Sequence, residues 1–161
     1  MQQEKKHNQA SGMKHHHYRH LAAMTVLSFL AMYILMYAMV DRFANVFNNV
    51  NQVYMAGLMA APMLLIELLV MRSMYPQRGR NIAIGIFAAV AMIGFWSLIR
   101  AQGGVGDAQF LRSMIPHHSG AVLMCRKASL QDAAIRKLCG EIVESQEREI
   151  AQMKVLLANP R

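Results

Sequence analysis

The run Met114-Ile115-Pro116-His117-His118 concentrates side chains that could bind a metal ion. A thioether beside two imidazoles suits soft or borderline metals, copper above all, better than the hard ions that prefer oxygen ligands. Adjacent residues of a helix point about 100° apart. We therefore expect His117 to face a partner helix as a ligand, while His118 faces elsewhere as a supporting or surface group.

Three apolar runs precede this motif, and each is long enough to cross a bilayer. Leu21–Val40 and Ile82–Ile99 have no charged residue, and Val53–Met71 has only Glu67. A hydrocarbon core about 30 Å thick needs about 20 apolar helical residues. The first run lacks a convincing cleavage site and is interpreted as an uncleaved anchor. The sequence thus predicts a multi-pass protein surrounded by membrane lipid.

Basic residues near the spans predict the orientation. Those before the first span or between the second and third are Lys5, Lys6, Lys14, Arg19, Arg72, Arg78 and Arg80. The loop between the first two spans has only Arg42, next to Asp41. The protein is therefore expected in a bacterial inner membrane, with its amino terminus on the cytoplasmic side and its C-terminal segment on the opposite, periplasmic side. Much of the net charge of +8 is this flanking charge, so nucleic acid is not an expected partner.

The chain divides into four expected segments. Residues 1–20 form a polar, histidine-rich cytoplasmic tail that should be disordered or lie at the membrane surface. Residues 21–100 form the three-helix membrane domain, in which Pro62 should bend the second helix. Two methionine stripes in these spans could relay Cu(I), but gap-filling packing is the favoured interpretation; they are Met32, Met36 and Met39, and Met55, Met59 and Met63. Residues 101–106 are a glycine-rich linker, and residues 107–158 form an extracytoplasmic helical hairpin.

The hairpin is predicted from helical periodicity on both sides of a turn at residues 129–132. Asp107 is expected to cap its first helix, Pro116 to kink that helix, and Asp132 to cap the second. The expected inner face of the first helix is Phe110, Met114, His117, Ala121, Met124 or Cys125, and Ala128. That of the second is Ile135, Leu138 or Cys139, Ile142, Glu149 or Ile150, Met153, and Leu156 or Leu157. The predicted fold class is all-α, with three transmembrane helices followed by an exposed antiparallel hairpin.

Cys125 and Cys139 lie seven residues before and seven residues after Asp132. Equal distance from the turn puts them at one height, where the Cα atoms can come within the 7 Å or so that a disulfide requires. The expected oxidising compartment favours such a bond. A reduced pair acting as copper thiolates is the rival interpretation.

The hairpin sequence resembles a known family. The residues of the resemblance are Asp107-x-x-Phe110-x-x-x-Met114-Ile-Pro-His-His118, then Ala121-Val-x-Met124, then Ile142-x-x-x-Gln146-x-x-Glu149-Ile150-x-x-Met153. The pattern is similar to the Domain of Unknown Function 305 family, which is ferritin-like and linked to copper and silver handling outside the cytoplasm. The resemblance implies a set of candidate metal ligands: Met114, His117, His118, Met124 and Met153.

Fuller members of that family resemble two such hairpins in tandem, whereas this chain has one, half of a ferritin-like four-helix bundle. Two copies would complete the bundle, so a homodimer or higher oligomer is expected. Docking of the hairpin onto its own membrane domain is the competing arrangement.

The expected function is a membrane-anchored extracytoplasmic protein that binds Cu(I), or silver, for copper homeostasis. The alternative is a metal-free module that docks another envelope protein. An enzyme is not expected, because the hairpin has no Glu-x-x-His pair of the di-iron type. The sequence also has no Ser/His/Asp set, phosphate loop or dinucleotide-binding fingerprint.

Overall fold

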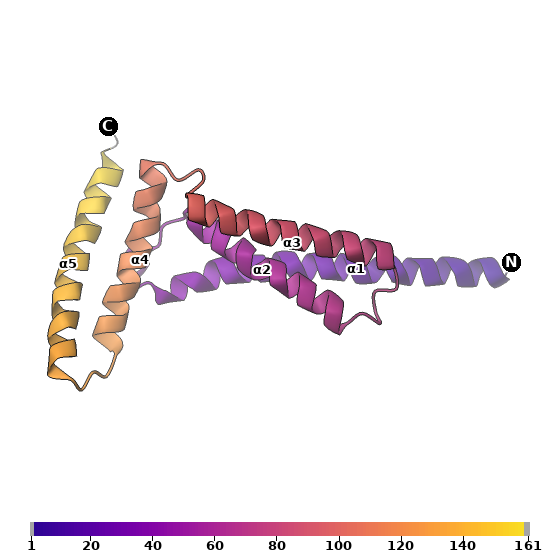
Figure 1. Ribbon diagram of the computed structural model, residues 1–161, viewed down its shortest axis with the longest axis horizontal. Helices are drawn as coiled ribbons and strands as arrows, with labels where there is room; N and C mark the ends of the chain where they lie inside the picture. Colours follow the sequence, from indigo (N-terminus) through magenta and orange to yellow (C-terminus); the bar gives the residue numbers. More distant parts are fainter. Residues whose placement is uncertain (1, 160–161) are drawn as a thin grey trace. The chain divides into compact units, whose positions relative to one another are not determined.

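The computed structural model describes the backbone of residues 2–159 and the side chains of residues 17–159. Over this range the chain is all-α, without β-strands, as predicted. The α-helices are α1 (Gln2–Leu35), α2 (Val50–Val70), α3 (Arg78–Ala101), α4 (Asp107–Lys127) and α5 (Ala133–Ala158), shown in Figure 1. Two short 3-10 helices, η1 (Met36–Met39) and η2 (Phe43–Asn45), follow α1. The chain forms two compact units, Met1–Tyr33 with Tyr54–Ala101 and Ile34–Val53 with Gln102–Arg161.

The three apolar runs form the long helices that the sequence predicts. Stretches long and apolar enough to cross a membrane are His17–Met39, Val50–Val70 and Arg78–Ala101. The second and third begin three and four residues before the predicted runs, because polar residues join the first turn of each helix. The backbone of residues 2–20 is helical, as the first part of α1, so this segment is not the disordered tail that the sequence allowed. The side chains of residues 1–16, among them His7, His15 and His16, lie outside the described residues.

The first unit is held together by apolar contacts among its three helices. Its core consists of Leu21, Leu64, Leu68, Tyr75 and Ala88. Gly57 of α2 lies against the ring of Phe95 of α3, so closely that an added Cβ atom would be 2.4 Å from it. The absence of a side chain at this position therefore permits the close approach of α2 to α3.

Two tyrosines, Tyr18 and Tyr75, form hydrogen bonds with polar side chains at one end of this unit. The Tyr75 hydroxyl donates a hydrogen bond of 2.9 Å to Glu67, so the one acidic residue of the second span has a partner. Burial and the neighbouring Glu67 carboxylate together raise the pKa of Tyr75 to about 12, which keeps the phenol protonated as a donor. Tyr18 donates to Asn81 over 2.7 Å, and the Arg80 guanidinium lies 4.7 Å from the centre of the Tyr18 ring.

One expectation about the spans needs correction. Met55, Met59 and Met63 are exposed along α2, so they do not fill gaps between the helices of this unit. Pro62 lies inside α2, as the sequence placed it.

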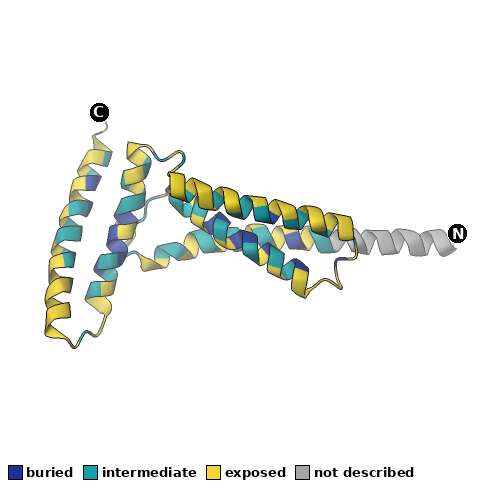
Figure 2. Cartoon of the chain, in the orientation of Figure 1, coloured by how far each residue is buried: buried dark blue, intermediate teal, exposed yellow. Residues whose placement is uncertain are grey.

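The second unit is built around α4. Helices α4 and α5 form the predicted antiparallel hairpin, and α4 also contacts η1 and η2, so it lies between α5 and the segment that joins α1 to α2. Figure 2 shows the buried residues of this unit gathered along α4. The core consists of Ile115, Ile150 and Met153, against which Phe47, Leu111, Met114 and Leu157 pack.

The predicted helix ends are right at one position and wrong at another. Asp132 caps α5, because its carboxylate accepts a 3.0 Å hydrogen bond from the Ile135 amide. Asp107 is instead the first residue of α4, and Gly106 occupies the capping position without a side-chain hydrogen bond. Helix α4 continues through Pro116.

The predicted inner face of α4 is wrong in phase. Phe110, His117 and Met124 are exposed, whereas the buried residues include Ile115, His118 and Val122. The inner face is therefore rotated by about one residue from the predicted one. Polar side chains explain the difference, because His118 and its neighbour Ser119 are buried through hydrogen bonds to distant partners.

Candidate metal site in the helical hairpin

His118 is the buried histidine of the hairpin. Only 8% of the residue is exposed, and its Nε2 atom lies 2.7 Å from Oε2 of Glu149 on α5. The other ring nitrogen, Nδ1, is buried and has no hydrogen-bond partner among the described residues. One imidazole nitrogen is thus engaged by a carboxylate across the hairpin, and the other is unsatisfied.

The Glu149 carboxylate determines which nitrogen can bind a cation. Hydrogen bonds from Ser145, over 2.7 Å, and from His118 hold the pKa of Glu149 below its usual value, so the carboxylate is ionised at neutral pH. An ionised carboxylate can only accept, so Nε2 of His118 must bear the proton. In that tautomer Nδ1 has a free lone pair. A histidine oriented by a carboxylate through one nitrogen is the usual arrangement of histidine ligands to metals.

Thioethers lie beside this pair on both helices. Met114 precedes His118 by one turn of α4, and Met153 follows Glu149 by one turn of α5. Because the helices are antiparallel, Met114 and Met153 are at one level, and Met114 packs against the core cluster that contains Met153. Met153 is buried, with 8% exposed. Both thioethers thus lie one helical turn from the His118–Glu149 pair, and thioethers together with an imidazole nitrogen are the donors that Cu(I) and Ag(I) favour.

The remaining candidates from the sequence lie away from this group. His117 and Met124 are exposed on α4. The ring centre of His117 is 6.1 Å from that of His118, so it is near but outside the hairpin interior. Among the side chains that the structure describes, no three of the types His, Cys, Asp and Glu lie together as a metal cluster. A metal ion bound here would thus depend on the methionines.

Glu149 is the residue of this candidate site that the sequence interpretation did not single out. It lies on the predicted inner side of the second helix, where the alternative at that turn is Ile150. A carboxylate on an otherwise apolar face needs a polar partner across the hairpin. That signal, together with the neighbouring histidines, could have identified the pair.

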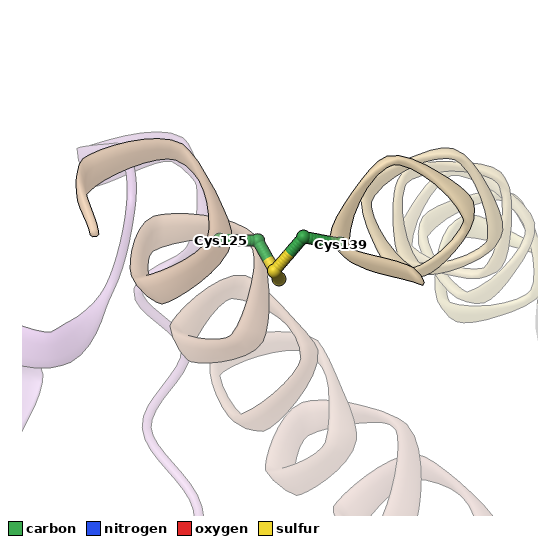
Figure 3. The surroundings of a disulfide bond; sticks show 2 residues. All are labelled: Cys125 and Cys139. Carbon is green, nitrogen blue, oxygen red and sulfur yellow. A yellow bond between two sulfur atoms is a disulfide. The ribbon is translucent and has the colours of Figure 1, made fainter. Parts of the chain in front are cut away.

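The two cysteines are bonded at the turn end of the hairpin. Cys125 of α4 and Cys139 of α5 form a disulfide with Cα atoms 5.2 Å apart, as shown in Figure 3. This is the pairing that equal spacing about Asp132 predicts. The bonded sulfurs are not thiolates, so in this form they are not available as copper ligands.

The segment between α1 and α2 is hydrogen-bonded to the hairpin. The Asp41 amide donates to Oγ of Ser119 over 2.8 Å, and the Ser119 hydroxyl donates back to the Asp41 carboxylate. Burial raises the pKa of Asp41, but hydrogen bonds from Ser119, Asn45 and Arg42 outweigh it and hold the pKa below its usual value. Arg42 also donates to Glu147 of α5 over 3.0 Å. Ser119, the neighbour of His118, is fully buried by these contacts.

Comparison with known proteins agrees with the resemblance seen in the sequence. The model of the family described as Domain of unknown function (DUF305) matches residues 95–157. The match begins inside α3, earlier than the resemblance that starts at Asp107. An uncharacterized protein of Acanthamoeba polyphaga mimivirus is 29% identical over 137 residues, which cover 83% of this chain and 88% of the viral protein. No solved structure matches the chain.

The viral alignment is longer than the segment that the family model matches, so it extends into the apolar helices. The two proteins are thus similar over more than the hairpin. Residues 95–157, which contain α4 and nearly all of α5, are similar in sequence to the DUF305 domain.

Proposed function

We propose that the protein is a membrane-anchored metal-binding protein that binds Cu(I), or the similar soft ion Ag(I), in its helical hairpin. The observation that supports this most directly is the buried Nδ1 atom of His118, unpartnered while Nε2 is held by Glu149. Met114 and Met153 complete the proposed ligand set. His117 and Met124, expected as ligands from the sequence, are outside it because they are exposed.

An unsatisfied nitrogen inside a protein is costly. A buried polar atom without a partner destabilises the fold by about 1–3 kcal/mol. Coordination of a cation by Nδ1 would remove this cost. Two neighbouring thioethers would favour a soft ion over Mg²⁺ or Ca²⁺, which take oxygen ligands.

The proposed location is a bacterial inner membrane, with the hairpin outside the cytoplasm. Three helices are long and apolar enough to span a membrane, and basic residues precede the first and lie between the second and third. An odd number of spans places the ends of the chain on opposite sides. An oxidising compartment around the hairpin agrees with the Cys125–Cys139 disulfide.

A metal-free interaction module of the cell envelope is the second candidate. Apolar side chains are exposed on the hairpin, and a cleft of about 450 Å³ lies between the first turn of α4 and the last turns of α5. The residues that line the cleft include Phe110, Leu111, Leu156 and Leu157. Another envelope protein or a second copy of the chain could bind there, with His118–Glu149 serving only as a structural pair.

A Cu(I) titration of the full-length chain in detergent separates these two functions. Affinity is measured by competition with a chromophoric Cu(I) chelator, using ascorbate to keep copper reduced and the disulfide intact. We expect His118→Ala to weaken binding more than 100-fold. Glu149→Gln, which disturbs only the orientation of the ligand, should weaken it by about 10–100-fold.

His117→Ala is the matched control, since it removes a neighbouring but exposed imidazole. It should bind Cu(I) within twofold of the wild type. Circular dichroism and thiol counting show whether each variant keeps its helices and its disulfide. Wild-type affinity in a folded His118→Ala variant would refute the proposed site and leave the interaction module.

A further inference from the structure

Phe43 is exposed to an unusual degree. Its exposed fraction is 90%, higher than that of any other large apolar side chain among the described residues. It begins η2, in the segment between α1 and α2. An isolated phenyl ring in water gains nothing from the hydrophobic effect, so a partner for this ring has to come from outside the unit.

The segment has two different sides. Asp41 is bonded to Ser119, and Asn45 accepts a hydrogen bond from Lys154 of α5, so these residues face the hairpin. Phe43 lies between them in the chain, and with 90% of it exposed its ring takes no part in those contacts. The polar side of the segment is therefore fixed to the protein, and the phenyl ring is presented on the free side.

Chain length limits how far Phe43 can be from the bilayer. It follows Met39, the last residue of the first apolar stretch, by four residues, which reach at most about 14 Å when fully extended. The second apolar stretch begins at Val50, so both ends of the segment are fixed at the same membrane surface. The headgroup layer on each side of a bilayer is roughly 5–8 Å thick. Phe43 is thus confined to the neighbourhood of this layer.

We infer that Phe43 inserts at the boundary between lipid headgroups and acyl chains, so that the segment Asp41–Asn45 fastens the hairpin to the membrane surface. Aromatic and leucine side chains occupy this boundary in interfacial segments. The inference rests on the membrane anchoring in the proposed function. It does not depend on metal binding.

One consequence concerns the candidate metal site. Asp41 is only two residues beyond the first apolar stretch, and its amide lies 2.8 Å from Oγ of Ser119. His118 is the residue before Ser119 on α4. The imidazole that would bind the metal is therefore held close to the membrane surface.

Tryptophan fluorescence tests the inference, because the chain has a single tryptophan, Trp96, in the third span. The variant Trp96→Phe/Phe43→Trp moves the only fluorophore to the segment. Wild type and variant are reconstituted into phosphatidylcholine vesicles with and without bromine on the acyl chains near the headgroup. The expected result is that emission from the variant is blue-shifted relative to tryptophan in water and is quenched by the brominated lipid.

Wild-type Trp96 is the reference for membrane insertion. If brominated lipid quenches the wild type but not the variant, the inference is overturned while membrane anchoring stands. If neither protein is quenched, the membrane anchoring itself is wrong. Blue-shifted emission from the variant that brominated lipid does not quench also overturns the inference, because protein then covers the introduced ring.

The same variant is titrated with Cu(I). Phe43 is not among the proposed ligands, so the affinity of the variant should stay within twofold of the wild type. Unchanged Cu(I) affinity would show that the fluorescence result for position 43 is independent of the metal site.

Discussion

The Cys125–Cys139 bond should supply much of the stability of the turn end of the hairpin. The cysteines are 14 residues apart, so the bond closes a loop of 15 residues. In the chain-entropy model a loop of about 15 residues lowers the entropy of the open chain by about 10 cal/mol/K, which amounts to about 3 kcal/mol at 25 °C. Replacing both residues by serine, a change of similar size, should therefore destabilise this end of the hairpin by about that amount.

Few other contacts can compensate for the loss. All of residues 131–138 are exposed, and the buried cluster of Ile115, Ile150 and Met153 lies away from the turn. Besides the disulfide, opening of the turn end is opposed by exposed contacts, namely the Arg126–Glu147 ion pair and the hydrogen bonds of Arg136 to the turn. A decrease of about 3 kcal/mol corresponds to opening that is roughly 150-fold more frequent.

Amide hydrogen exchange of the full-length chain in detergent measures this opening directly. Oxidised wild type, reduced wild type and Cys125→Ser/Cys139→Ser are compared at one pH. Amides flanking the turn should exchange about a hundredfold faster in the second and third samples, with smaller changes beside Ile115 and Ile150. Reductant should have no effect on the serine variant, which is the control for reduction elsewhere.

Two results would contradict this reasoning. Protection near the turn that stays within twofold of the oxidised protein would show that native contacts, not the covalent loop, hold the helices together. Two free thiols in unfolded protein purified without reductant would show that the bond does not form in the cell.

Two further predictions concern acid stability and assembly. Because the pKa of Glu149 is lowered in the folded protein, the stability that this carboxylate contributes is present at neutral pH and is lost as the pH falls through its folded value. Helix content followed during acid titration should therefore decrease less steeply in Glu149→Gln than in the wild type, and an identical acid dependence in the variant would contradict the assignment. A homodimer should have twice the 18.1 kDa chain mass in mild detergent after the detergent contribution is subtracted; a strictly monomeric mass with a folded hairpin would exclude it.

The sequence predicted those parts of the fold that local patterns determine. Continuous apolar runs predicted the three long helices, and equal distances from the turn predicted that Cys125 and Cys139 would meet. Asp132 was identified as a cap because a carboxylate before a helical pattern can bond the free amides of the first turn. Each of these inferences needs only residues close together in the chain.

The rotation of α4 could not be predicted in the same way. The stripe through Phe110, His117 and Met124 is helical in period, but so is the stripe through Ile115, His118 and Val122. Each stripe has two apolar residues and one histidine, so hydrophobicity does not choose between them. The second stripe is the buried one because residues distant in the sequence form hydrogen bonds with it. Glu149 bonds His118 from 31 residues away, and Asp41 bonds Ser119 from 78 residues away.

The segment between α1 and α2 is the part of the second unit that no sequence pattern indicated. Its packing on the hairpin depends on pairs such as Arg42 and Glu147 of α5, which are 105 residues apart. The sequence left two ways to cover the hairpin, by a second copy or by the chain's own membrane domain. In this structure residues from the end of α1 to the start of α2 cover part of α4, so a dimer would use the outer faces that remain exposed.

Two neighbouring buried side chains fix the rotation of α4 from both sides. His118 and Ser119 point about 100° apart on the helix, one toward Glu149 of α5 and the other toward Asp41 of the preceding segment. Rotating α4 to bring His117 inward would break both hydrogen bonds and leave buried polar groups unpaired. The position of the His118 imidazole is therefore determined by the protein alone. The proposed site would lose little conformational entropy on binding, which is the condition under which a small set of soft ligands can bind a cation tightly.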